Sequence, residues 1–258
     1  MRFLIAMLVL VAAMPAFADP MASDRSRYNA CLAQVKADPG RAVAVAQAWR
    51  IENGGVPARH CQALAEAASK DWPAALKSFE GAAKASEAAN DGQAAALWSQ
   101  AATTAMLAEQ PAAAVKYIDT AIPLAGGGKT EASLRLDRAE ALVDLKRDPE
   151  AAADLDTATR LDPDVEWGWL LKATLARRMH DYKTAETAIL EAAKRQPDSA
   201  EVQLEAGNIA AAQGNAELAH TAWVGAAAAD PDSPAGKAAQ ALLAPADAAM
   251  PTPPAAPR

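Results

Sequence analysis

Small and large apolar residues recur along the chain at a fixed interval of 34 residues. When the segments 132–165, 166–199 and 200–233 are superimposed, small residues coincide at three positions and a large apolar residue at a fourth. The small residues are Ala139, Ala173 and Gly207, then Ala151, Ala185 and Ala219, then Ala158, Ala192 and Ala226, and the large ones are Leu155, Ile189 and Trp223. Prolines recur at the same interval, and since proline cannot continue a helix we expect each to separate one segment from the next; they are Pro163, Pro197 and Pro231.

A repeat of this length with small residues at these positions resembles the tetratricopeptide repeat, in which each unit is a pair of antiparallel helices. Trp169 and Tyr182 occupy positions where that family prefers aromatic residues. Arg138 and Lys172 depart from the leucine that is usual at the seventh position, and Gln203 departs from the tryptophan that is usual at the fourth. The resemblance implies an all-α solenoid, a superhelix of antiparallel helix pairs, because small residues let helix backbones approach while the large residue fills the space between pairs.

Two weaker copies of the repeat precede this region, so we expect tetratricopeptide-like repeats over 56–128 as well as the three consecutive ones over 132–233. The matching residues are Ala63, Trp72, Ala75, Phe79 and Ala82 in segment 56–89, and Trp98, Ala102, Ala114, Ile118 and Ala121 in segment 95–128. Pro57 and Asp71 predict the starts of the two helices in the first copy. Gly126–Gly128 ends the second copy, and we expect Thr130 to be the N-cap of the next helix.

The two ends of the solenoid are expected to differ from its middle, because terminal repeats face solvent on one side. Residues 19–55 predict a degenerate helix pair. Its first helix, 23–36, carries an apolar face that consists of Tyr28, Cys31, Leu32 and Val35. Its second helix begins at Asp38-Pro39 and ends at Gly54-Gly55. Residues 234–243 predict a capping helix, and the Pro/Ala-rich composition of 244–258 predicts a disordered tail.

Residues 1–18 have the pattern of a secretory signal peptide. Arg2 precedes an apolar run over residues 3–11, and Ala16-Phe17-Ala18 provides small residues for cleavage. A membrane anchor is the alternative, but the run is short against the roughly 20 residues that span a bilayer. We therefore expect cleavage at about Ala18, a mature chain that begins at Asp19 in the periplasm or outside the cell, and no stable membrane insertion.

Export bears on Cys31 and Cys61, the two cysteines of the chain. Two cysteines in an exported protein predict a disulfide, which would tie the first helix of the terminal pair to the first helix of segment 56–89. The alternative is a reactive thiol or a metal site that uses the neighbouring His60. Two cysteines and one histidine provide fewer than the four ligands of a structural zinc site, so the disulfide is favoured.

Composition and motifs argue against several classes of function. The chain has 258 residues and a formal net charge of −7, without the clustered basic surface that nucleic acids require. Residues 127–130, Gly-Gly-Lys-Thr, match only the end of a phosphate-binding loop and follow a predicted helix where that motif needs a strand. His60, His180 and His220 lie in different repeats, without a triad-like set of partners. We expect no enzyme activity, no cofactor, no metal and no nucleic-acid partner.

What remains is the surface of the solenoid. In proteins of this family, residues two, five, six, nine, twelve and thirteen of each first helix point into a concave groove that binds partners. The corresponding residues here are Gln100, Thr103, Met106, Leu136, Asp137, Glu140, Asp144, Trp167, Leu170, Thr174, Arg177, Arg178, Leu204 and Asn208. Asp137 and Glu140 would face Arg177 and Arg178 of the next repeat. Trp167 either anchors a partner or packs on a neighbouring helix, and the sequence leaves both readings open.

The resemblance therefore implies a non-catalytic scaffold of the periplasm that binds a peptide or helix of a partner protein in its groove. The family's chaperone-binding members use a lysine and asparagine clamp, which this groove lacks apart from Asn208. An alternative is a structural subunit of a cell-envelope assembly complex, or a factor that associates with itself. A catalyst that uses His60 and a reduced Cys61 is the third hypothesis. The identity of the partner and the oligomeric state stay open.

Overall fold

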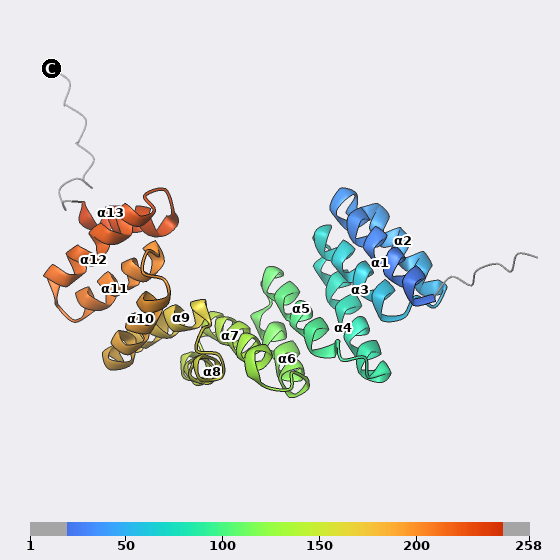
Figure 1. Ribbon diagram of the computed structural model, residues 1–258, viewed down its shortest axis with the longest axis horizontal. Coiled ribbons are helices and arrows are strands. Elements are labelled where there is room, and N and C mark those ends of the chain that lie inside the picture. The colour runs from blue at the N-terminus through green and yellow to red at the C-terminus, as the bar shows by residue number, and fades with distance from the viewer. Residues whose placement is uncertain (1–19, 245–258) are drawn as a thin grey trace, which may run out of the picture. The chain divides into compact units, whose positions relative to one another are not determined.

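The computed structural model describes residues 20–244, which form thirteen α-helices, one 3-10 turn and no strand (Figure 1). The elements are α1 (Pro20–Ala37), α2 (Pro39–Ile51), α3 (Gly55–Ala68), α4 (Trp72–Ala89), α5 (Ala94–Leu107), α6 (Pro111–Ala121), η1 (Ile122–Leu124), α7 (Gly128–Asp144), α8 (Asp148–Leu161), α9 (Glu166–Arg178), α10 (Tyr182–Arg195), α11 (Ala200–Ala212), α12 (Ala216–Ala229) and α13 (Pro234–Leu243). The prediction of an all-α fold is confirmed. The predicted signal peptide and the tail from residue 245 lie outside the described residues.

Several predicted helix starts are confirmed by hydrogen bonds of their N-cap side chains. Asp38 accepts a hydrogen bond from the backbone N–H of residue 41 at 3.0 Å, and Asp71 accepts one from residue 74 at 3.2 Å. Ser233 Oγ accepts from the N–H of residue 236 at 3.0 Å, where α13 begins. Thr130 was wrongly predicted as an N-cap, because α7 begins at Gly128 and its N-cap is Gly127 with φ of 86°. A positive φ suits glycine, which lacks a Cβ, so the glycine run starts this helix and leaves Thr130 within its first turn.

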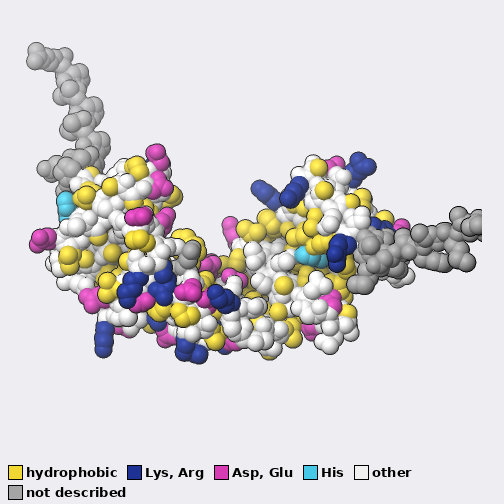
Figure 2. Space-filling view, viewed as in Figure 1, with side chains coloured by type: hydrophobic (Ala, Val, Ile, Leu, Met, Phe, Trp, Pro, Cys, Tyr) yellow, Lys and Arg dark blue, Asp and Glu magenta, His cyan; other side chains and the backbone are white. Residues whose placement is uncertain are grey.

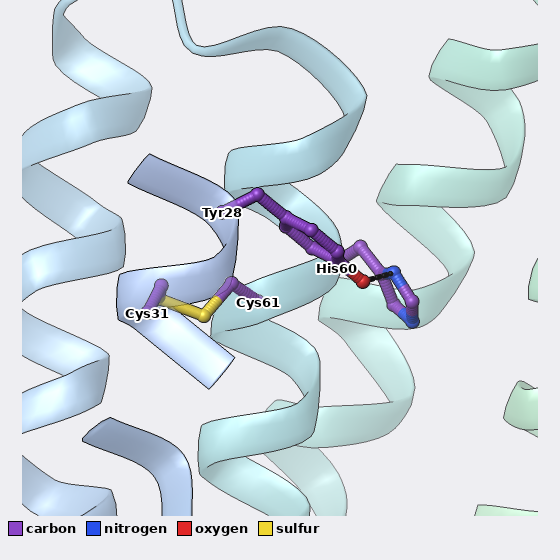
Figure 3. The surroundings of a disulfide bond; sticks show 4 residues. All are labelled: Tyr28, Cys31, His60 and Cys61. Atoms are coloured by element: carbon purple, nitrogen blue, oxygen red, sulfur yellow. Dashed lines mark hydrogen bonds between the residues drawn. A yellow bond between two sulfur atoms is a disulfide. The ribbon is translucent and has the colours of Figure 1, made fainter. Parts of the chain in front are cut away.

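The chain divides into two compact units within α4, one up to Ala85 and the other from Ser86. In the first unit, α1 packs against α2 and α3, and α2 packs against α3. Cys31 of α1 and Cys61 of α3 form the predicted disulfide, with their Cα atoms 6.3 Å apart (Figure 3). Beside it, the Tyr28 hydroxyl lies 2.8 Å from Nδ1 of His60, and the two rings stack (Figure 3). The first helices of two adjacent pairs are thus joined covalently.

The second unit consists of four antiparallel helix pairs, α5/α6, α7/α8, α9/α10 and α11/α12, followed by α13. The second helix of each pair packs against the first helix of the next, and α13 packs against α11 and α12. The alanines at the repeated small positions are buried at these helix–helix contacts, among them Ala151, Ala185 and Ala226. Close packing of short side chains thus replaces the thick aromatic core of other folds.

The seventh position of the repeat explains two departures from the family pattern. Arg138 binds both carboxylate oxygens of Asp154, with Nε–Oδ2 at 2.7 Å and Nη2–Oδ1 at 2.6 Å, and its Nη1 reaches Asp119 of the preceding pair at 2.5 Å. Hydrogen bonding to Asp154 is the main cause that raises the pKa of Arg138 above its ordinary value. Lys172 similarly pairs with Asp156 at 2.8 Å. Ion pairs therefore bridge the helices where leucine would otherwise pack.

Among residues 20–244, no helix combines the length and apolar character that crossing a membrane requires.

Candidate partner-binding face

The predicted groove residues lie on α5, α7, α9 and α11, whose outward side we call the first-helix face. Most of them are at least partly exposed, including Met106, Thr174 and Leu204. Leu136 and Leu170 are corrections: both are buried, and Leu170 belongs to a core cluster with Ile189. Both leucines occupy the fifth position of the repeat and pack there out of contact with water, whereas Leu204 at the same position of the last pair is partly exposed. Neither leucine offers surface to a partner.

Three carboxylates follow one another along the exposed side of α7. Asp137, Glu140 and Asp144 are spaced by three and four residues, so they lie on one face of the helix. We call these three residues the acidic stripe. Among the described residues, no lysine or arginine forms an ion pair with any of them. Within residues 20–244, the stripe is therefore a line of negative charge that no cation pairs with.

The environment of the stripe disfavours ionisation. The pKa of Asp137 is raised to about 6, mainly by partial burial and to a lesser extent by the negative charge of Glu140. Burial, and second the charge of Asp144, also raise the pKa of Glu140. Desolvation and like charge both penalise a carboxylate. A cation placed against the stripe would relieve both effects.

Arg177 and Arg178, which were predicted to face the stripe, form their ion pairs with other carboxylates. Arg177 Nε donates to Glu205 Oε1 at 2.6 Å, and Nη2 donates to Oε2 at 3.2 Å, which links α9 to α11. Arg178 Nη2 lies 3.3 Å from Asp148 Oδ2 at the start of α8. Figure 2 shows basic and acidic side chains intermixed over the helices α7 to α10. The basic pair is neutralised within the chain.

Glu205 is the residue that the sequence reasoning missed. It is only 6% exposed, and it lies at the sixth position of its repeat, one of the groove positions of the family. That position could have identified it. Asn208 is also engaged: its amide nitrogen lies 3.3 Å from Glu205, and its oxygen accepts from the indole of Trp223 at 3.2 Å. The amide of Asn208 therefore holds α11 and α12 together and is not free to bind a carboxylate.

Trp167 and Trp169 are two residues apart on α9 and have different environments. The indole of Trp169 donates to the carbonyl of Pro163 at 2.8 Å, and Lys172 and Arg195 each lie 5.3 Å from its ring. Trp167 remains 54% exposed. More than half of this side chain is therefore not covered by a neighbouring helix. An exposed tryptophan is the residue type that most often anchors an interface.

The polar residues at the remaining predicted positions make local contacts. Thr103 Oγ1 donates to the carbonyl of Ser99 at 3.1 Å within α5, and Gln100 lies half exposed on the same helix. Neither contributes charge to the face. Its chemical character therefore comes from the acidic stripe and Trp167.

The catalytic hypothesis for Cys61 and His60 has little geometric support. Both cysteines are buried and bonded to each other, so no thiolate is present. Within residues 20–244, no group of three or more His, Cys, Asp or Glu side chains has the arrangement of a metal site.

No protein-family model and no curated protein matches the chain, whereas solved structures do. YrrB, described as a TPR protein with an unusual peptide-binding site, is 17% identical over 76% of this chain and 96% of its own, with a TM-score of 0.58. PilF of Pseudomonas aeruginosa is 14% identical over 86% and 98%, with a TM-score of 0.65. PilW, a type IV pilus biogenesis factor, is 17% identical over 86% and 100%, with a TM-score of 0.67. Similarity at sequence identities this low establishes a shared fold and not a shared function. Together with the repeat and the helix pairs, they show that the chain has the tetratricopeptide-repeat fold.

Proposed function

We propose that the chain is a non-catalytic protein-interaction scaffold that binds an extended peptide or a helix of a partner protein on its first-helix face. The predicted signal peptide over residues 1–18 supports a site of action in the periplasm or outside the cell. Similarity in fold to YrrB, whose structure is described by its peptide-binding site, supports the choice of a peptide as ligand. Because that support is only an analogy between folds, the argument for peptide binding must also come from the residues of this chain.

The observation that carries the proposal is the unpaired acidic stripe together with exposed Trp167. A partner segment with lysine or arginine would supply the cation that Asp137 and Glu140 lack, and an apolar residue would cover the indole. Complementary charge orients a bound segment and speeds its association, while a few apolar anchors provide most of its affinity. We therefore expect a basic, partly apolar segment.

Protonation of the stripe should control this binding. Because the pKa of Asp137 is about 6, its carboxyl is ionised at pH 7.5 and largely protonated at pH 5. A bound cation favours the ionised form, so affinity should fall as the pH drops through this range. It should also fall with added salt, which screens exposed charges.

The test is capture of partners from periplasmic extract on the immobilised protein. Trp167→Ala and the triple substitution Asp137→Asn, Glu140→Gln, Asp144→Asn should each reduce the captured partner at least fivefold. The matched control removes three exposed carboxylates elsewhere in the same unit, at Glu109, Asp198 and Glu217, and should bind as the wild type does. A partner that both test variants capture at the wild-type level would exclude the first-helix face.

A second candidate function, self-association, is favoured by an apolar furrow in the last two pairs. The furrow lies between α10, α11 and α12, has a volume of about 440 Å³ and is lined mainly by apolar side chains. Leu190 and Leu218 flank it and are 61% and 58% exposed. If two copies of the chain pack there, the apparent mass from light scattering rises with concentration, and Leu190→Asp with Leu218→Asp abolishes the rise. A mass that is constant for the wild type would exclude this alternative.

A further inference from the structure

The first unit contains a second pocket that differs from the first-helix face in place and in chemistry. It lies between the end of α2 and the helices α3 and α4, and its volume is about 450 Å³. The polar side chains that line it are Arg50, Arg59, Gln62, Glu66, Lys77 and Ser78. All of them belong to the unit before Ser86. We call it the polar pocket.

A buried carboxylate lies in the wall of this pocket. Glu66 is 6% exposed, and its Oε1 accepts a hydrogen bond from Gln62 Nε2 at 2.6 Å. Gln62 is held in turn by Arg50, whose Nη1 donates to Gln62 Oε1 at 2.7 Å. The second oxygen of Glu66, Oε2, is buried and makes no hydrogen bond to another described residue. Glu66 lines the pocket, and a buried acceptor without a donor costs free energy. A ligand donor that displaces the side chains covering Oε2 would therefore be favoured there.

The same pocket presents three cations. Among the described residues, no carboxylate forms an ion pair with Arg50, Arg59 or Lys77. Arg59 Nη1 lies 3.9 Å from the place that a Cβ on Gly81 would take, so its guanidinium sits against α4. The three cations line the same space that Glu66 borders, and Glu66 forms no ion pair with them.

An equivalent furrow in the second unit shows how the chain treats such charges elsewhere. Between α6, α7 and α8 a furrow is lined by Asp119, Arg138 and Asp154, and Arg138 donates hydrogen bonds to both carboxylates. There the cation comes from the seventh position of the repeat. In the polar pocket, Gln62 occupies that position, and the charged side chains around it form no ion pair with one another. Unlike the furrow, the polar pocket therefore has no ion pair among the described residues that holds its charged side chains together.

We propose that the polar pocket binds a small anionic amino acid, with two carboxylates and one ammonium group. The ammonium donates to Glu66 Oε2, and the carboxylates bind Arg59, Lys77 and the exposed side of Arg50. The three cations and one carboxylate of the pocket complement the two carboxylates and one ammonium of glutamate or aspartate. A volume of about 450 Å³ accommodates a molecule of that size.

Isothermal titration of the full chain with L-glutamate, glutarate and L-glutamine tests each part of the proposal. Glutarate lacks the ammonium group, and L-glutamine lacks one carboxylate. L-glutamate should bind at micromolar to millimolar concentration, and each analogue should bind at least tenfold more weakly. Equal affinity for glutarate and L-glutamate, or no binding of L-glutamate at millimolar concentration, would overturn the assignment.

Substitution of Glu66 makes the test specific to the buried oxygen. Glu66→Gln keeps the shape of the side chain and an oxygen that can accept from Gln62, so the free energy of unfolding should change little. The substitution should lower the affinity for L-glutamate at least tenfold and leave the affinity for glutarate unchanged. The matched control, Glu80→Gln, changes a carboxylate of α4 that pairs with Lys84 outside the pocket, and it should alter neither affinity. An equal loss for both ligands in Glu66→Gln would contradict the role of Oε2.

Discussion

Ionisable side chains on the first-helix face differ in whether their own chain supplies a partner. Arg177 and Glu205 neutralise each other between α9 and α11 at 2.6 Å, whereas Asp137 and Glu140 meet only burial and like charge. The first arrangement stabilises the stack of helices, because Glu205 is buried and its charge is paired there. The second leaves charge for a ligand. Stability and binding on this face therefore depend on different residues.

Arg177→Leu should destabilise the second unit by roughly 2–3 kcal/mol, because it leaves the carboxylate of Glu205 buried without its cation. Arg178→Leu is the matched control. Its pair with Asp148 is longer and more exposed, so the loss should stay under about 1 kcal/mol. Urea unfolding followed by circular dichroism measures both. Equal losses would show that the link between α9 and α11 contributes no more than a surface ion pair.

Ionisation of Asp137 should lower stability as the pH rises from about 4 to about 6. The folded pKa of about 6 lies above the ordinary value, so the folded state holds the proton more tightly than the unfolded state over this window. Asp137→Asn removes this loss. Allowing for the partial exposure of the side chain, the free energy of unfolding of the variant should exceed that of the wild type by about 1 kcal/mol at pH 7.5 and should equal it at pH 4. Chemical unfolding at the two pH values measures it. Asp198→Asn, an exposed control, should show no such dependence, and a gain that is equal at both pH values would contradict the shifted pKa.

At this scale the sequence predicted side-chain positions better than partners. Trp167, Glu140 and Asp144, which the repeat register places on the surface, are exposed, whereas Asp137 is partly buried. The register placed Arg177 opposite the stripe, but this arginine pairs with a carboxylate of another helix, because a long side chain can reach either neighbouring helix and the register fixes only its Cα. The burial of Leu170 was also missed, because a position between the groove and the contact with the next helix has no distinct sequence signal.

Within single helix pairs, a large residue at one position determines how small its neighbour must be. In the last pair, the indole of Trp223 occupies the place that a Cβ on residue 207 would take. The two preceding repeats carry the smaller Leu155 and Ile189 at the position of Trp223, and they tolerate alanine where the last pair has glycine. Gly207 is therefore the counterpart of Trp223.

Gly207→Ala should destabilise the protein by about 1–3 kcal/mol, because the added methyl group displaces the Trp223 ring in a packed contact. Gly225→Ala, on the facing helix of the same pair, provides the control. Its Cβ would meet only the end of the flexible Gln203 side chain, and alanine favours a helix over glycine, so its effect should be small. Thermal unfolding compares the two. A Gly207→Ala variant as stable as Gly225→Ala would mean that the ring moves freely.

The disulfide stabilises the first unit by closing a loop between residues 30 positions apart. In the chain-entropy treatment, a loop of this length contributes about 3–4 kcal/mol. Replacement of Cys31 and Cys61 by alanine should therefore raise amide hydrogen exchange in α1 to α3 and leave α7 to α12 unchanged, since each repeat depends mainly on its neighbours. The variant should not respond to reductant. Faster exchange throughout both units would show that the chain unfolds as one cooperative body.

Over the whole chain, the fold was predictable because one pattern repeats. Buried alanines, proline breaks and N-caps such as Asp38 and Ser233 all pointed to the same helix pairs. The N-cap of α7 was missed by three residues, because three glycines with positive φ can begin a helix as well as end one. The polar pocket was not predicted, since its residues come from three helices and only the packed structure brings Glu66 and Arg50 to one space.

The central claim is that partners bind the first-helix face, and photo-cross-linking in cells tests it most directly. A photoreactive amino acid at Glu140, on the acidic stripe, should form a covalent adduct with a basic segment of a partner protein. The same amino acid at Leu218, beside the apolar furrow, should form none. Adducts from Leu218 with none from Glu140 would contradict the account and favour self-association.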